Sequence, residues 1–205
     1  MPNLDPIDPA YAIACRALVA STAAPLAGLS DAPATKAQYL ACIAPPGLEG
    51  DALSEEMGTM WSCALTTLGL WRMLGVQHKL LQTPYVVGQA MAWVQQIAYD
   101  FKAWNDGDSN NPNTFDVGDA VLVRAGQHVV AAIVSKTPTS PYFYDTVEGG
   151  QITAAGLKSI ERYYNKSYTR TAAGIFLGSS KVYGWVDCTR LGLNVIASWT
   201  PDPHT

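Results

Sequence analysis

Cys63 is a thiol at the expected start of a helix, within the segment TMWSCALTTLGLWRMLG (residues 59–75). Thr59 or Ser62 can cap this helix, and Gly75 is the residue type usually found just past a helix end. The first turn of a helix carries partial positive charge and free backbone N–H groups, and both stabilise a thiolate. The Cys63 amide is then the first candidate donor to an oxyanion. A buried structural cysteine is the alternative interpretation.

The best candidate for a base is His128, one of three histidines in the chain. It opens the apolar run HVVAAIVSK (residues 128–136), which predicts a strand buried on both faces. His78 follows a helix end, where a solvated or helix-capping role is expected, and His204 lies in a proline-containing tail. His128 is therefore the histidine most suited to deprotonate a thiol, with a structural role as the alternative.

A third group must fix the tautomer and orientation of an imidazole base. If TPTSP (residues 137–141) is the turn of a hairpin, Val130 faces Glu148. Glu148 then projects on the same face as His128, one diagonal neighbour away. Gln151 has the opposite parity, unless the two glycines before it form a bulge. Glu148 is the first candidate for orienting His128, and Gln151 is the second.

Composition narrows the class of protein. The chain has 205 residues, of which 48% are hydrophobic, with a formal net charge of -4. These values fit a single domain, with an N-terminal helical segment (residues 1–50) packed on a catalytic domain (residues 51–205). The acidic balance and scattered Lys and Arg residues argue against nucleic acid as a partner. No run of about 18 apolar residues is present, so no membrane span is expected.

The cysteine pattern and the N-terminal residues carry two further expectations. The four cysteines show no C-x-x-C spacing, so no metal site or other cofactor is expected, and a disulfide among Cys15, Cys42 and Cys188 is left open. The first residues lack the positive charge of a secretion signal, and Arg16 interrupts their apolar run. We therefore expect a folded helix there, and a protein made in the cytoplasm.

The spacing of apolar residues changes from helical in the first half of the chain to alternating in the second. Helices are expected over residues 9–44 as a helix–loop–helix pair, 62–74, 83–104 and 152–164. A polar loop is expected over 105–119, and strands over 120–125, 128–136, 142–150, 170–178 and 180–188. This order predicts an α+β fold in which N-terminal helices pack on a mostly antiparallel sheet.

The order of these features resembles the papain-like NlpC and CHAP families of bacterial cysteine peptidases and amidases. Cys63 stands at a helix start, and a Gly-Asp turn (residues 118–119) precedes a strand. His128 opens the next strand, and Glu148 lies on the strand after it. The resemblance covers residues 59–151 and implies a papain-like core with the nucleophile at a helix start.

The segment TVEGGQ (residues 146–151) is similar to the CHAP segment that carries a glutamate, with Gly150 where those proteins often have asparagine. The resemblance implies a thiol hydrolase of amide bonds in peptidoglycan. Trp61, Ser62 and Trp104 are candidates for lining its cleft, although large aromatics more often belong to the core.

A cell-wall substrate would require delivery without an N-terminal signal, as for a phage lysin or an antibacterial toxin of the type VI secretion effector kind. An immunity protein would then be a partner. The alternatives are an inert papain-like binding module, and an intracellular cysteine protease or transferase that acts on proteins.

Overall fold

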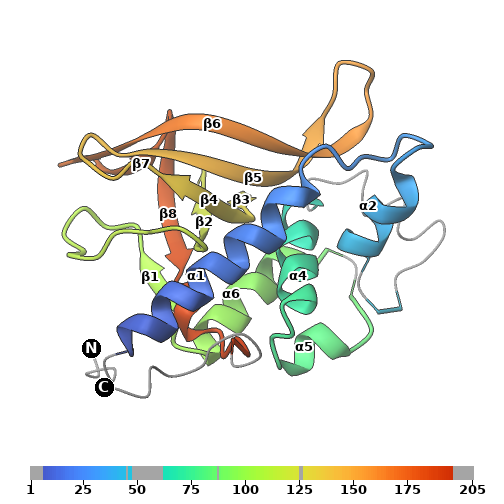
Figure 1. The fold of residues 1–205 in the computed structure, drawn as a ribbon, viewed down its shortest axis with the longest axis horizontal. Helices are drawn as coiled ribbons and strands as arrows, with labels where there is room; N and C mark the ends of the chain where they lie inside the picture. The colour runs from blue at the N-terminus through green and yellow to red at the C-terminus, as the bar shows by residue number, and fades with distance from the viewer. Residues whose placement is uncertain (1–6, 45, 48–61, 87, 125–126, 196–205) are drawn as a thin grey trace.

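The structure, a computed structural model, describes residues 7–44, 46–47, 62–86, 88–124 and 127–195. Its helices come first and its strands follow, which confirms the α+β class (Figure 1). The helices are α1 (Pro9–Ala23), α2 (Lys36–Ile43), α4 (Ser62–Met73), α5 (Lys79–Gln82) and α6 (Ala90–Asp100), with 3-10 turns η1 (Ala24–Leu26) and η2 (Cys188–Arg190). The strands are β1 (Trp104–Asp106), β2 (Ala120–Val123), β3 (His128–Val130), β4 (Ala132–Lys136), β5 (Phe143–Ile152), β6 (Lys158–Thr171), β7 (Gly174–Leu177) and β8 (Ser180–Val186).

The first helices begin and end largely where the sequence predicts. Asp8 caps α1 by accepting a hydrogen bond from the Tyr11 amide at 2.8 Å. Helix α4 ends at Met73, and Gly75 follows with a φ of +73°. That left-handed conformation is one that glycine adopts without strain, so it stops the helix.

The predicted helix over residues 83–104 is wrong at its start. Thr83 closes the last turn of α5, because its amide donates to the Lys79 carbonyl. The chain is not helical at Tyr85. The Tyr85 amide donates a hydrogen bond to the Pro46 carbonyl, and the Tyr85 hydroxyl accepts one from the Ala90 amide at 2.9 Å. Helix α6 therefore begins at Ala90, with the tyrosine hydroxyl taking up an amide of its first turn.

The strands form an eight-stranded sheet in which every paired neighbour is antiparallel. The order is β3-β2-β8-β7-β6-β5-β4, and β1 pairs with β8 off this path. The helix predicted over residues 152–164 is wrong, because Lys158–Thr171 is the long strand β6, which pairs with β5 over residues 158–167 and with β7 over residues 168–171. Its tyrosines favour an extended strand once a partner strand is present. Likewise, β1 occupies the first residues of the predicted loop 105–119.

The run 128–136 is also extended, but Ala131 divides it into two strands. β3 pairs with β2, whereas β4 pairs with β5. In the β4–β5 ladder Ala132 lies opposite Val147, so the predicted Val130–Glu148 register is wrong by one residue. The first and last strands of the sheet order are thus neighbours in the chain, and β3 contacts both α4 and β5.

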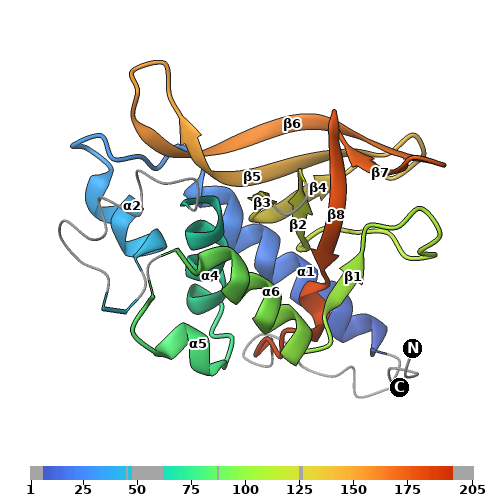
Figure 2. The same ribbon diagram turned by 180° about the vertical axis from the view of Figure 1, so that it is seen from behind.

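Helix α4 is the centre of the helical layer, with every residue from Ser62 to Trp71 buried. Helices α1, α2 and α6 pack around it, and it contacts β5 directly. The two views show the helices gathered on one side of β5 and β6 (Figures 1 and 2). The apolar core contains Val19 and Ile43 from the N-terminal segment together with Leu65 and Val147. No helix of the described part of the chain is long and apolar enough to span a membrane.

Candidate active site

Cys63 is the second residue of α4 and is 2% exposed. Strand β5 reaches the start of this helix through two consecutive glycines. A Cβ added to Gly149 would clash with the Thr66 hydroxyl, and one added to Gly150 would come within 2.9 Å of the Cys63 amide nitrogen. Gly150 also has a φ of +72°, in the left-handed region. Both positions therefore require glycine, and this close approach brings the end of β5 against the thiol-bearing turn.

His128 lies between the helix start and the sheet. Its ring forms a hydrogen bond with the Cys63 side chain, and Nε2 lies 2.9 Å from Oε2 of Glu148. Burial acts to lower the pKa of His128, but the hydrogen bonds and charges of Cys63 and Glu148 raise it to about 9. The structure thus brings the three residues into one chain of contacts, thiol to imidazole to carboxylate, and the two partners of the ring favour its protonated form over that of an isolated imidazole.

Glu148 is 3% exposed, and both of its oxygens are occupied. Oε2 faces His128, while Oε1 accepts a hydrogen bond from the Thr146 hydroxyl at 2.6 Å and pairs with the Lys166 ammonium. Burial raises the pKa of Glu148, but the bonds to His128, Lys166 and Thr146 lower it to about 2. A buried carboxylate with this set of donors stays ionised and fixed in position.

The sequence did not point to Lys166 or Thr146. Thr146 has the parity of Glu148 on β5, which is a signal that could have identified it. Lys166 comes from β6, whose pairing with β5 was missed when residues 152–164 were interpreted as helix. Its ammonium also lies 4.6 Å from the centre of the Tyr163 ring.

Gln151, the second candidate for orienting His128, lines the same cavity but has other partners. Its side chain accepts a hydrogen bond from the Tyr163 hydroxyl at 2.8 Å and donates to the Gly149 carbonyl at 3.3 Å. The β5–β6 register does shift between Glu148 and Gln151, as two glycines allow, yet the bulge leaves the carboxylate on the imidazole. Of the two candidates, Glu148 holds His128.

The three residues proposed to line a cleft lie in different places. Trp61 falls outside the described residues. Ser62 is 2% exposed and buried against Gly150, so it is part of the helix–strand contact. Trp104 lies on β1 and lines a pocket whose residues do not include Cys63, His128 or Glu148. The expectation that Trp104 lines a cleft together with Cys63 is therefore not met by this pocket.

A cavity of about 360 Å³ opens beside the imidazole. Its lining residues are Arg124, His128, Glu148, Gly150, Gln151, Tyr163, Lys166, Leu177, Gly178, Ser179 and Ser180. It is bounded by three parts of the sheet: the end of β2 with the start of β3, the β5–β6 pair, and the turn between β7 and β8. A substrate that enters it would meet His128 and Glu148 at its wall.

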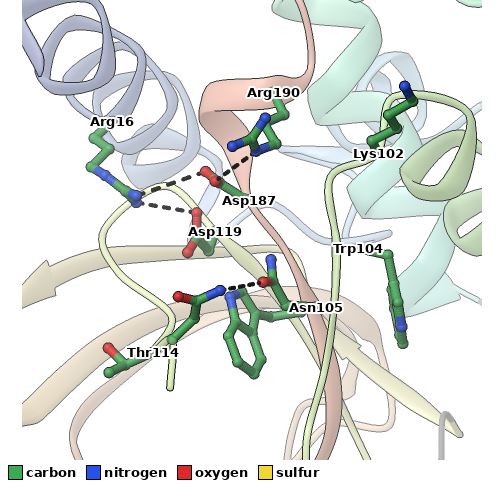
Figure 3. Close-up of a pocket in the computed structure, with 10 residues that line it drawn as sticks. Arg16, Lys102, Trp104, Asn105, Thr114, Asp119, Asp187 and Arg190 are labelled. Atoms are coloured by element: carbon green, nitrogen blue, oxygen red, sulfur yellow. Dashed lines mark hydrogen bonds and ion pairs between the residues drawn. The ribbon is translucent and has the colours of Figure 1, made fainter. Parts of the chain in front are cut away.

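The second pocket holds a network of ion pairs (Figure 3). Arg16 reaches from α1 to Asp119 at 3.1 Å and toward Asp187 at 3.7 Å, and Arg190 pairs with Asp187 from another side. Asp119, the acidic residue of the Gly-Asp turn, also accepts from the Cys188 amide at 3.1 Å.

Asp119, Asp187 and Cys188 are close enough to share a metal ion. The Arg16 guanidinium already lies against both carboxylates, so the group is better suited to tie α1 to the sheet than to coordinate a cation.

The remaining cysteines, and His78, lie outside the contact chain of Cys63, His128 and Glu148. All four cysteines are buried, and none of them forms a disulfide. Burial raises the pKa of the Cys15 thiol and of the Cys188 thiol, and raises that of Cys42 to about 11. His78 caps α5 by accepting a hydrogen bond from the Leu80 amide, as expected of a capping histidine. His204 lies outside the described residues.

No family model, no curated protein and no solved structure matches the chain.

Proposed function

We propose that the protein is a cysteine hydrolase that cleaves amide bonds, with Cys63 as nucleophile, His128 as base and then acid, and Glu148 as the group that orients the imidazole. The observation that carries the proposal is the contact chain in which His128 joins the Cys63 side chain to a buried, ionised Glu148. A structural histidine in a core needs neither a thiol partner nor a carboxylate held by two further donors.

The reaction would begin with transfer of the Cys63 proton to His128, which leaves a thiolate beside an imidazolium. The thiolate attacks the carbonyl carbon, and the resulting oxyanion is held by N–H groups of the first turn of α4, with the Cys63 amide as the candidate donor. The imidazolium then donates its proton to the amine as the C–N bond breaks. Water, deprotonated by His128, hydrolyses the thioester and releases the acid.

The proposed fold family and substrate follow from the resemblance to the NlpC and CHAP families. Its supports in the structure are the helix-start thiol, the histidine that opens β3 and the acidic residue on β5, in that order along the chain. We therefore propose a papain-like core and an amide bond of peptidoglycan as the substrate.

The experiment is digestion of purified peptidoglycan, with the products identified by mass spectrometry. We expect new amine and carboxyl ends from the wild-type protein and none from Cys63→Ala. Thermal unfolding of both proteins provides the control, because loss of one sulfur from a folded helix start should leave the fold intact. Equal digestion by the two proteins would rule out Cys63 as the nucleophile, and no digestion by the wild type would rule out peptidoglycan as the substrate.

A second candidate is an inert binding module, and one observation favours it. Cys63 is as buried as the three other cysteines, at 2% exposure. In that case its thiol would only fill space between α4 and the sheet, and it would react no faster than the other three.

A further inference from the structure

The cavity beside His128 is lined by more positive than negative side chains. Its cations are Arg124 and Lys166, in addition to the imidazole. Its one carboxylate, Glu148, is already held by His128, Thr146 and Lys166. Lys166 is therefore neutralised by the group that it pairs with, and Arg124 is left as the cavity's uncompensated charge.

Arg124 is placed at this wall by its backbone. It has a φ of +55°, a left-handed conformation that is uncommon for a residue with a side chain. The conformation is held on both sides, since the Arg124 amide donates to the Lys181 carbonyl and the Arg124 carbonyl accepts from the Gln127 amide, each at 3.1 Å. Strained backbone of this kind persists where the surrounding structure over-determines it, and it occurs often at binding sites.

The guanidinium has no acidic partner in the described part of the chain. None of the ion pairs found among these residues involves Arg124. Burial and the charges of Glu148 and Glu161 raise the pKa of Tyr163, another residue of the cavity wall, and the charge of Arg124 acts in the opposite direction. The Tyr163 hydroxyl is itself engaged with Gln151.

We propose that this cavity binds an anionic group of the substrate, and that Arg124 is the residue that selects for it. Ser179, which follows β7, and Ser180, the first residue of β8, also line the cavity and are neutral residues that can donate hydrogen bonds. A planar guanidinium pairs with a carboxylate through two parallel hydrogen bonds, so a carboxylate close to the scissile amide is the fitting chemistry. The inference rests on the proposed function, because it names the substrate class of that same site.

The experiment compares two reagents that alkylate Cys63 and differ in charge: iodoacetate, which is anionic, and iodoacetamide, which is neutral. In each case the sulfur displaces iodide, and the thiol proton passes to His128 or to water. The ratio of the two rate constants at Cys63 is measured by mass spectrometry for the wild type, Arg124→Gln and Arg124→Lys. Lys79→Gln is the matched control, since it removes the same charge from an exposed position on α5, outside the cavity.

We expect the ratio of iodoacetate to iodoacetamide rates to fall about three- to ten-fold in Arg124→Gln, on the basis of one charge acting over several ångströms. Arg124→Lys should keep most of the preference, and Lys79→Gln should leave it unchanged. A ratio that is unchanged in Arg124→Gln, or that falls equally in Lys79→Gln, would overturn the inference.

The neutral reagent separates this inference from the proposed function. Equal iodoacetamide rates in all four proteins show that Cys63 and His128 are intact, so a change in the ratio then reports Arg124 alone. If Cys63 of the wild type is inert to both reagents, the proposed function fails, and the inference that depends on it fails as well.

Discussion

Replacement of Glu148 by glutamine keeps the size of the side chain and removes its charge. In the wild type the carboxylate faces Nε2 of His128 at 2.9 Å and is 3% exposed, so water cannot replace it readily. The amide would leave the Lys166 ammonium without its counter-charge and would no longer stabilise the imidazolium. Glu148→Gln should therefore lower the pKa of His128 and reduce turnover.

The size of the effect follows from the kind of bond that is lost. A hydrogen bond to a charged group contributes about 1.5–3 kcal/mol, which corresponds to about one to two pKa units. The pKa of His128 is about 9 in the wild type. We expect it to fall to roughly 7–8 in Glu148→Gln, with a loss of turnover of about ten- to a hundred-fold. Glu148→Ala should be more severe, because it also removes the acceptor and leaves a space.

Histidine NMR titration measures the pKa directly, since the chain has only three histidines and His128→Ala assigns the signal. His78 is an internal control, because its ring lies against Asp100 and not against Glu148. Glu161→Gln is the matched variant: it removes a carboxylate from the residue opposite Glu148 on β6, with no bond to His128 found in the structure. A midpoint for His128 that is the same in the wild type and in Glu148→Gln would refute the reasoning.

Four further predictions follow from the same contacts. Lys166→Met should raise the pKa of His128, which is opposite to the effect of Glu148→Gln, and should reduce turnover about three- to ten-fold. Lys166→Arg should restore both the pKa and the turnover, which are measured by NMR titration and by a rate assay. Gln151→Ala should change turnover less than two-fold in the same rate assay. Gly150→Ala should destabilise the fold by about 1–3 kcal/mol in urea unfolding, because its Cβ would meet α4 at a left-handed φ. The pKa of His128 is raised from 6.5 to about 9 and that of Glu148 lowered from 4.5 to about 2, so the pair stabilises the fold fully from pH 4.5 to 6.5. That stability should disappear as the pH rises through 9 or falls through 2, and the difference in urea midpoint between wild type and Glu148→Ala measures it.

The sequence predicts the elements that carry the candidate site better than the way they pair. The helix that holds Cys63 and the strand opened by His128 are signalled locally, by a following glycine and by an apolar run. The hairpin register that selects Glu148 is off by one, and the contact of Glu148 with His128 arises because the chain divides at Ala131, so that β3 does not continue β4 in the ladder with β5. A break of this kind depends on which strands lie on either side, and no local pattern encodes it.

The parts that the sequence did not predict depend on contacts between distant segments. Residues 152–164 lack strict alternation, and they contain the end of β5, a turn and the first half of β6, whose backbone is satisfied by pairing with β5. Lys166 reaches Glu148 only through that pairing. Arg124 acquires its place from a left-handed turn, for which an arginine gives no signal. The Trp104 prediction was made from residue type alone, and aromatic residues lie on many surfaces.

The most direct test of the central claim is the rate at which each cysteine reacts with iodoacetamide, measured by mass spectrometry in the wild type and in His128→Ala. Cys15, Cys42, Cys63 and Cys188 are all buried to a similar degree, so accessibility alone predicts four slow and similar rates. The account predicts that Cys63 reacts at least ten-fold faster than the other three in the wild type and loses this advantage in His128→Ala. Four equally slow cysteines, or a fast Cys63 that is unaffected by loss of His128, would contradict it.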